Sequence, residues 1–426
     1  MSPVVTRRHL LKLLSIGAAS SAASACAGAG LPLVAHRPAA LEPPPVPTPA
    51  PPIPEPTSAP PPPAPPEPTP EPVLPAEPAR PTLTQMIGQM LLVGFRGTAL
   101  DPTNPVVADL QTANLGGVML SDYDGLYKTW GLNITDPQQV QRLVRDLHSV
   151  AATPPLIAID QEGGQVMRFK PQYGFPANVG HAELGATNNL AFTREQATVI
   201  AKTLAEMGVN LNFAPVVDLN INPDNPVIAR YGRSFSAQPA QVLAHALVYI
   251  LAHHAVGVGC TLKHFPGHGS STGDSHEDWV DVTATWQWQE LEPYRALIDA
   301  GVVDAIMTAH IYNANFDSND PATLSSATIN GLLRDQLGYH GVVISDDLQM
   351  AAITRYYGYD LAIQQAITAG VDILLIANNA MYAADTVPRT VALIAGWVQQ
   401  GIIPIERIEL SYQRIQRMKA GLASIK

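Results

Sequence analysis

From residue 82 onward the chain repeats one pattern eight times: a short apolar run, a polar or glycine-rich end, and a longer segment. Near-continuous apolar runs are typical of strands buried on both faces of a parallel sheet. The longer segments 137–151 and 194–208 have the apolar spacing of amphipathic helices. Eight such units in roughly 300 residues predict an α/β fold, a single (β/α)8 TIM-type barrel, with a doubly wound open sheet as the alternative. The apolar runs lie at residues 89–95, 116–122, 155–164, 210–218, 259–269, 304–310, 341–347 and 371–379.

Polar side chains stand where these runs end. In a barrel of this type the carboxyl ends of all the strands meet at one mouth, which carries the active site, while the strand interiors fill the core. Ionisable groups contributed to one mouth by six strand ends indicate an enzyme. The polar residues at these ends are Asp160, Glu162, Asp218, Lys263, His264, His310, Asp346, Asp347 and Asn378.

The segment before the barrel is rich in proline. Residues 38–81 contain 22 of the chain's 40 prolines, so half of this segment's backbone N–H donors are missing. Such a composition has no periodic apolar face and favours a solvated, extended, polyproline-type spacer. We therefore predict a disordered Pro-rich tether over residues 26–81 and a folded domain over residues 82–426. A ligand for SH3-type domains is the alternative role of the tether.

The first 25 residues have the pattern of an export signal. Arg7 and Arg8 precede a short apolar run that ends in small residues, which is typical of a signal peptide of the twin-arginine kind rather than of a spanning helix. The sequence Ala-Ser-Ala before Cys26 resembles a bacterial lipobox and also fits an ordinary A-x-A cleavage site. Processing at the lipobox would make Cys26 the lipidated N-terminus of the mature protein. The predicted tether favours this alternative over ordinary cleavage.

Charge and cysteine content exclude several classes of function. Cys26 and Cys260 are the only cysteines, so no disulfide framework is possible and stability depends on core burial. The formal charge is −11, and cleavage after residue 25 removes three basic residues and no acidic one, which gives −14. An acidic mature protein argues against a nucleic-acid partner and against electrostatic docking on anionic lipid.

The stretch KHFPGHGSSTGDSHEDW, residues 263–279, holds three histidines, three acidic residues and a lysine. The spacing of His264 and His268 suggests a metal site, but the proline and glycine between them prevent the helix that would align both rings. A polar surface loop is a second interpretation. The third is acid–base chemistry, because Asp274 lies two residues before His276 and can orient its ring and set its pKa.

These residues also carry a resemblance. Eight short sequence blocks occur in this order: IGQMLLVGF, IAIDQEGGQVMRF, NLNFAPVVDLNINPDNPVI, GRSF, KHFPGHG, DSH, MTAH and ISDDLQM. Together they resemble glycoside hydrolase family 3, in its single-domain β-N-acetylglucosaminidase branch, over nearly all of residues 82–426. The resemblance implies a retaining exo-β-N-acetylglucosaminidase that needs neither metal nor cofactor.

The resemblance also implies roles for individual residues. Asp346 would be the nucleophile, and successive side chains of a strand alternate, so Asp346 and Asp347 would face opposite ways. His276 would be the acid/base, polarised by Asp274. The sugar would be bound by Asp160, Arg233, Lys263 and His264, with Arg230 as an alternative to Arg233. His310 would be a pocket-wall or a core histidine, and Asp218 would brace the pocket.

Export and a tether imply action outside the cytoplasmic membrane, on peptidoglycan fragments or related glycans, by a monomer attached to the membrane through Cys26 or else secreted. The alternatives within enzymes are a family 3 β-glucosidase and a phosphate-dependent glycosidase. The alternative outside enzymes is a non-catalytic surface lipoprotein that binds sugar.

Overall fold

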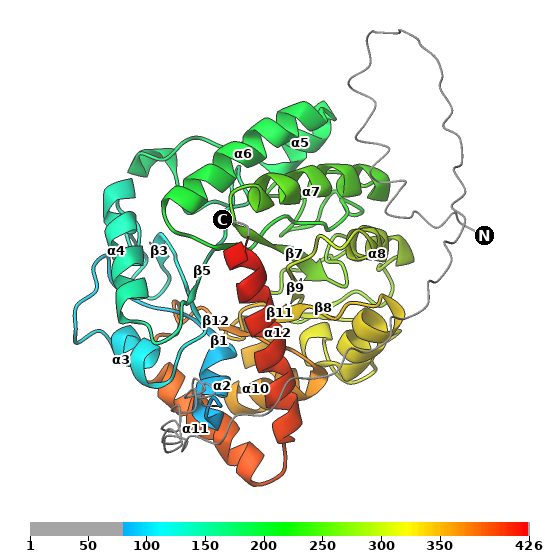
Figure 1. Cartoon of the computed structure of the whole chain (residues 1–426). Helices are drawn as coiled ribbons and strands as arrows, with labels where there is room; N and C mark the ends of the chain where they lie inside the picture. Colours follow the sequence, from blue (N-terminus) through cyan, green and yellow to red (C-terminus); the bar gives the residue numbers. More distant parts are fainter. Residues whose placement is uncertain (1–79, 425–426) are drawn as a thin grey trace, which may run out of the picture. The chain divides into compact units, whose positions relative to one another are not determined.

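The structure is a computed structural model that describes residues 80–424 (Figure 1). The predicted export signal, almost all of the predicted tether and Cys26 lie outside the described residues. Within them, eight parallel strands form one sheet in the order β11-β9-β7-β6-β5-β2-β1-β12. A parallel bridge between Ile344 and Ile373 joins the two edge strands and closes the sheet. The strands are β1 (Leu91–Gly94), β2 (Gly117–Met119), β5 (Leu156–Ile159), β6 (Leu211–Asn212), β7 (Gly259–Phe265), β9 (Ala305–Thr308), β11 (Val342–Ser345) and β12 (Leu374–Ile376).

Every predicted apolar run contains one of these strands, and each strand neighbours the one that precedes it in the chain. The predicted (β/α)8 barrel is therefore confirmed, and the doubly wound open sheet is wrong. The strand residues are buried almost throughout, as strands covered on both sides must be.

Helices cover the outside of the barrel (Figure 1). Local sequence fixes their starts: α4 begins at Pro137, where the Asp136 side chain accepts a hydrogen bond from the backbone N–H of Gln139. The buried residues Val140, Leu143, Val144 and Leu147 form its inner face. The helices are α2 (Leu83–Gln89), α3 (Pro105–Thr112), α4 (Pro137–Val150), α5 (His181–Thr187), α6 (Leu190–Glu206), α7 (Pro239–His254), α8 (Glu292–Asp299), the π-helix η4 (Ala327–Gln336), α9 (Ala351–Thr354), α10 (Tyr359–Ala369), α11 (Thr386–Gln399) and α12 (Ile405–Ser424).

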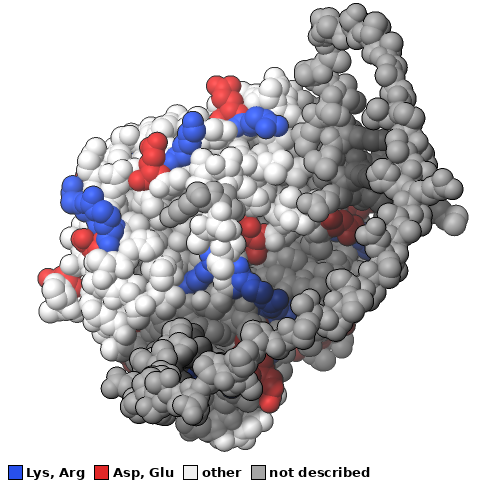
Figure 2. Space-filling model, viewed as in Figure 1, with Lys and Arg blue, Asp and Glu red and all other residues white. Residues whose placement is uncertain are grey.

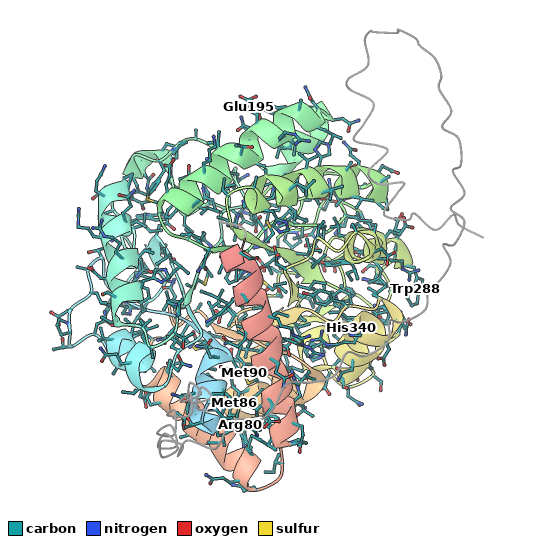
Figure 3. All side chains as sticks on the ribbon, viewed as in Figure 1. Arg80, Met86, Met90, Glu195, Trp288 and His340 are labelled. Atoms are coloured by element: carbon teal, nitrogen blue, oxygen red, sulfur yellow. The ribbon has the colours of Figure 1, made fainter. Side chains whose placement is uncertain are left out.

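Helices α2 and α12 close the end of the barrel where the strands begin, and α12 crosses the front of the view in Figure 1. The Lys419 ammonium of α12 donates to the carbonyl oxygens of Gly116 and Pro154, just before β2 and β5. Met86 and Met90 pack at the same end, near α12 (Figure 3). This end is therefore sealed by packing and hydrogen bonds, which leaves the opposite end for a pocket.

The loops contain several short strands and turns. The hairpin strands β3 (Tyr123–Asp124) and β4 (Thr129–Trp130) pair antiparallel, and β8 (Val280–Asp281) pairs in parallel with β10 (Ile311–Tyr312). Three 3₁₀ turns complete the list: η1 (Pro171–Tyr173), η2 (Trp288–Leu291) and η3 (Ala322–Leu324).

No helix within residues 80–424 is both long and apolar enough to cross a membrane. On the face shown in Figure 2, the acidic and basic side chains that can be seen lie interspersed rather than gathered by sign.

Candidate active site

A cavity of about 490 Å³ opens where the strands end. Its walls come from residues in all eight strands or in the loops that follow them, so segments far apart in the sequence share one pocket. The cavity is lined by all seven residues that we predicted for catalysis or sugar binding: Asp160, Arg233, Lys263, His264, Asp274, His276 and Asp346.

Four charged side chains at one wall of the cavity are joined by ion pairs. The Lys263 ammonium lies 2.8 Å from Asp160 and 2.7 Å from Glu162, and Arg233 donates two bonds of 2.9 and 2.8 Å to Glu162. Burial would raise the pKa of Glu162, but Arg233 and Lys263 outweigh burial and hold that pKa well below its usual range. The pKa of Asp160 is likewise lowered, because the neighbouring charges of Lys263 and Arg168 outweigh its burial. The wall therefore presents fixed, fully ionised hydrogen-bonding groups.

Arg233, rather than Arg230, is the arginine that faces inward. Arg233 is buried and lines the cavity, whereas Arg230 is exposed and packs on the Tyr231 ring. The Nη2 atom of Arg233 also lies 3.2 Å from Nε2 of His264.

A buried carboxylate sets the orientation of His264. Asp218 lies 2.7 Å from Nδ1 of His264 and accepts from the backbone N–H groups of His264 and His268. The pKa of Asp218 is lowered, because His264 and these hydrogen bonds outweigh the effect of burial. Asp218 thus braces the pocket by fixing the ring that lines it.

His264 and His268 do not face one another as two ligands of one metal ion would. Their rings meet edge to face with centroids 5.9 Å apart, and His268 Nε2 lies 3.2 Å from the Ser275 hydroxyl. Within residues 80–424 no group of three or more His, Cys, Asp or Glu side chains is arranged to hold a metal ion.

The loop after β7 carries the predicted dyad. Nδ1 of His276 lies 2.7 Å from Oδ1 of Asp274, which also accepts from the His276 backbone N–H at 2.9 Å. Burial lowers the pKa of His276, but the hydrogen bond to Asp274 and the charges of Asp346 and Asp274 outweigh it and raise that pKa. An imidazole whose pKa is raised stays protonated to higher pH than a free imidazole and can donate its proton to a bound molecule.

Two adjacent carboxylates follow β11. Burial would raise the pKa of Asp346, but His310, His264 and His276 outweigh it and lower that pKa to about 2. Burial raises the pKa of Asp347 to about 6, and its carboxylate accepts from the backbone N–H groups of Gln349 and Ala377. Both residues line the cavity, although we expected them to face opposite ways. Of the two, only Asp347 accepts a hydrogen bond from the segment after β12.

His310 lies behind this pair. Its Nε2 faces the carbonyl oxygen of Asp347 at 2.9 Å, and its Nδ1 lies 2.8 Å from the Thr323 hydroxyl. Burial lowers its pKa. His310 does not line the cavity, so it supports the β11 end from the core side.

Glu162 is the functional residue whose importance sequence reasoning missed. It anchors both Arg233 and Lys263, although it received no role from the motif alone. Its position two residues after Asp160, on the same side of an extended chain, was the available signal.

Comparisons with known proteins agree with this geometry. A family model described as "Glycosyl hydrolase family 3 N terminal domain" matches residues 82–418. The chain is 34% identical over 370 residues to Beta-hexosaminidase A of Pseudoalteromonas piscicida, covering 80% of this chain and 61% of that protein. It is 37% identical over 328 residues to a Beta-hexosaminidase of Xylella fastidiosa, covering 74% of this chain and 92% of that protein.

A solved structure is also similar. A glycoside hydrolase family 3 beta-N-acetylglucosaminidase from Paenibacillus sp. str. FPU-7 superposes with a TM-score of 0.73 at 34% identity, covering 81% of this chain and 63% of that one. The chain thus spans less than two thirds of the length of two of these three proteins.

Proposed function

The chain belongs to glycosyl hydrolase family 3, and from this premise we propose that it is a retaining exo-β-N-acetylglucosaminidase that removes terminal β-linked N-acetylglucosamine. The observation that carries the proposal is that Asp346 and the His276–Asp274 pair line the same cavity as the Asp160–Lys263 ion pair. The names of the similar proteins point to the same reaction.

Asp346 is suited to be the nucleophile because its low pKa keeps the carboxylate ionised throughout the neutral range. In the first step a carboxylate oxygen of Asp346 bonds to the anomeric carbon as the glycosidic C–O bond breaks. His276 gives its proton to the departing oxygen. In the second step neutral His276 takes a proton from water, whose oxygen bonds to the anomeric carbon while the ester to Asp346 breaks.

Sugar binding is assigned to the charged wall. Asp160 accepts from sugar hydroxyls, and Lys263, His264 and Arg233 donate to the same ring or its N-acetyl group. Salt bridges to Glu162 and Asp218 hold these donors before substrate arrives, so little ordering is needed on binding.

We further propose that the enzyme acts as a monomer outside the cytoplasmic membrane, on peptidoglycan fragments or related glycans. The sequence supports this through the export signal, the lipobox-like residues before Cys26 and the proline-rich segment. On this proposal, Cys26 would carry the lipid and the proline-rich segment would connect it to the catalytic domain.

The test compares 4-nitrophenol release by the purified chain from the β-N-acetylglucosaminide and the β-glucoside, without added metal. We expect the N-acetyl sugar to be preferred by at least about 100-fold in kcat/KM, because a site built to hydrogen-bond a substituent discriminates strongly against its absence. Preference for the glucoside would replace the substrate assignment. No release from either substrate would favour a sugar-binding protein, and formation of a sugar 1-phosphate in added phosphate would indicate a phosphorylase.

The residue assignments are tested by substitution. We expect Asp346→Asn to lower kcat by at least about a thousandfold, since it removes the nucleophile. Asp360→Asn is a suitable control, because Asp360 is exposed and pairs only with Arg389 on the surface. An active Asp346→Asn variant would contradict the assignment of the nucleophile.

A further inference from the structure

The loop of residues 272–279, which carries the Asp274–His276 pair, has a single buried residue. Ser275 is 2% exposed, whereas Asp274 and His276 on either side of it are more open to solvent. The Ser275 hydroxyl lies 3.2 Å from Nε2 of His268, whose side chain is equally buried. Since a buried polar group needs a hydrogen-bond partner, this contact gives the middle of the loop a defined inner attachment.

The backbone that carries the His268 ring is itself held in place. The His268 backbone N–H donates to Asp218 at 2.8 Å, and its carbonyl oxygen accepts from the Asn225 side-chain amide at 2.8 Å. The next N–H group, that of Gly269, donates to the buried Glu290 carboxylate at 3.2 Å. Three side chains therefore fix the support on which the ring is mounted.

The His268 ring has no direct part in the chemistry. It does not line the cavity, and its buried Nδ1 atom has no hydrogen-bond partner within residues 80–424. Burial and the charge of His264 lower the pKa of His268 to about 4, so the ring is neutral at neutral pH. His268 therefore neither contacts substrate nor transfers a proton, and its polar contact with Ser275 connects it to the reaction.

The position of Ser275 sets the position of both members of the acid/base pair. Oδ1 of Asp274 reaches across Ser275 and meets both Nδ1 and the backbone N–H of His276, at 2.7 and 2.9 Å. The carboxylate and the imidazole are thereby joined as one unit around Ser275. A shift of Ser275 must therefore move this unit relative to the cavity.

We propose that His268 and Ser275 are positioning residues, whose hydrogen bond holds the Asp274–His276 pair where His276 can give its proton to the departing oxygen. The proposal rests on the proposed function and adds to it two residues that do not touch the substrate. Proton donation depends steeply on the placement of the donor. The attack by Asp346 comes from the end of another strand, β11, and does not involve this loop.

The test compares Ser275→Ala with the unaltered chain on two aryl β-N-acetylglucosaminides that differ in their need for a proton. A 3,4-dinitrophenolate departs without protonation, whereas a 4-methoxyphenolate departs readily only when it is protonated. We expect kcat/KM to fall by about tenfold or more for the 4-methoxyphenyl substrate and by less than about twofold for the 3,4-dinitrophenyl substrate. A general distortion of the site would lower both values.

Ser271→Ala is the matched control. Ser271 is buried in the same stretch of chain, but its hydroxyl has no hydrogen-bond partner in the part of the chain that the structure describes. This variant deletes the same chemical group four residues before Ser275. It should leave kcat/KM unchanged for both substrates.

His268→Phe tests the same hydrogen bond from its other end, because it keeps a ring and removes both nitrogen atoms. We expect the same selective loss as in Ser275→Ala. The double variant should lose about tenfold as well, rather than the product of about a hundredfold, since both changes remove one interaction. Should His268→Phe fail to fold, Ser275→Ala and Ser271→Ala still carry the comparison.

Unchanged kcat/KM of Ser275→Ala for the 4-methoxyphenyl substrate would overturn the proposal. An equal loss for both substrates, or an equal loss in Ser271→Ala, would also overturn it, because either result indicates a distorted fold rather than a misplaced proton donor. If the unaltered chain released no phenol from either substrate, the proposed function itself would fail, and the positioning role with it.

Discussion

Two neighbouring carboxylates, Asp346 and Asp347, have pKa values moved in opposite directions by their surroundings. Burial acts on both, but the charges of His310, His264 and His276 outweigh it at Asp346, whereas at Asp347 two backbone hydrogen bonds do not. Coulombic attraction by nearby positive charge favours the ionised form, whereas desolvation disfavours it. This difference supports assigning the proposed nucleophile to Asp346 and a structural role to Asp347.

Replacing Asp274 should change the pH dependence of the reaction. The hydrogen bond and charge of Asp274 raise the pKa of His276, so Asp274→Asn lowers it. The general acid must be protonated, and the alkaline limb of kcat/KM reports its pKa in the free enzyme. We therefore expect this limb to move to lower pH and kcat/KM at pH 8 to fall about tenfold or more. The profile should be measured with a substrate that has a poorly departing leaving group.

The control for this prediction is Asp278→Asn. Asp278 lies in the same loop but pairs with Arg355 and accepts from the Tyr356 hydroxyl, rather than from His276. A limb that moves equally in both variants would mean that the loop, rather than the Asp274–His276 pair, governs the titration.

Sequence predicted the residues of the site better than the bonds between them. Asp160, Lys263 and Asp346 could be predicted because they end strands of a barrel. The choice between Arg230 and Arg233 could not, since it depends on the path of an irregular loop with no periodicity. The position of Glu162 two residues after Asp160 could not identify its partner Arg233 either, because the two residues lie 71 positions apart.

The loop that carries His276 is fastened to α9 at its outer end. The Ser275 carbonyl oxygen accepts from the Ala352 backbone N–H, and the Tyr356 hydroxyl donates to Asp278 at 2.6 Å. Trp279 packs between the rings of Tyr312 and Tyr356. These contacts are partly exposed, so we expect them to hold the loop over the cavity while still allowing it to open.

Tyr356→Phe should therefore lower kcat while leaving stability unchanged. It removes one hydrogen bond from an exposed residue, which changes the free energy of unfolding by less than about 0.5 kcal/mol. We expect kcat to fall about two- to fivefold because the loop spends less time closed over the substrate. Steady-state kinetics and thermal unfolding measure both quantities, with Tyr412→Phe on α12 as the control. Unaltered kcat would show that the fastening is not limiting.

Besides the hydrogen bonds of Lys419, a buried carboxylate ties helix α12 to the barrel. Asp372 precedes β12 and pairs with Arg334 at 2.8 Å and with Arg407 and Arg414 at 3.2 Å. Asp372→Ala leaves three guanidinium groups without their counter-charge, and removal of one partner from a buried pair costs roughly 3–5 kcal/mol. Thermal or urea unfolding should show this loss.

The exposed pair of Asp360 and Arg389 provides the comparison. Asp360→Ala should cost less than about 1 kcal/mol, because surface ion pairs contribute little. Equal losses in Asp372→Ala and Asp360→Ala would contradict a special role for the buried cluster. Below its unfolding temperature Asp372→Ala should keep its kcat/KM, since Asp372 lies at the barrel end away from the cavity.

Long elements were predictable and short ones were not. The eight strands are near-continuous apolar runs, and α4 has a clear apolar face. Strands β3 and β4 have two residues each and no periodic signal. The strand β6 is also shorter than its apolar run, because its pairing with β7 becomes irregular after Asn212 and continues only as a bridge between Val216 and Lys263.

At the scale of the whole molecule, stability and chemistry occupy opposite ends of the barrel. The end where the strands begin is closed by α2, α12 and the Asp372 cluster, and the other end holds the cavity. Strand direction alone makes this division predictable from the sequence, because every polar strand end falls on one side.

The last prediction concerns where the whole protein resides. If Cys26 is lipidated, the protein expressed in a bacterium with lipoprotein processing should be found in the membrane fraction and incorporate labelled fatty acid. Each buried methylene contributes about 0.8 kcal/mol, and two or more acyl chains hold a protein stably on a bilayer. Cys26→Ser should remove the label and move the protein to the soluble exported fraction with unchanged kcat/KM. Replacing Arg7 and Arg8 by lysine should instead block export. An unlabelled protein that is soluble even with Cys26 present would refute the anchor while leaving export and catalysis intact.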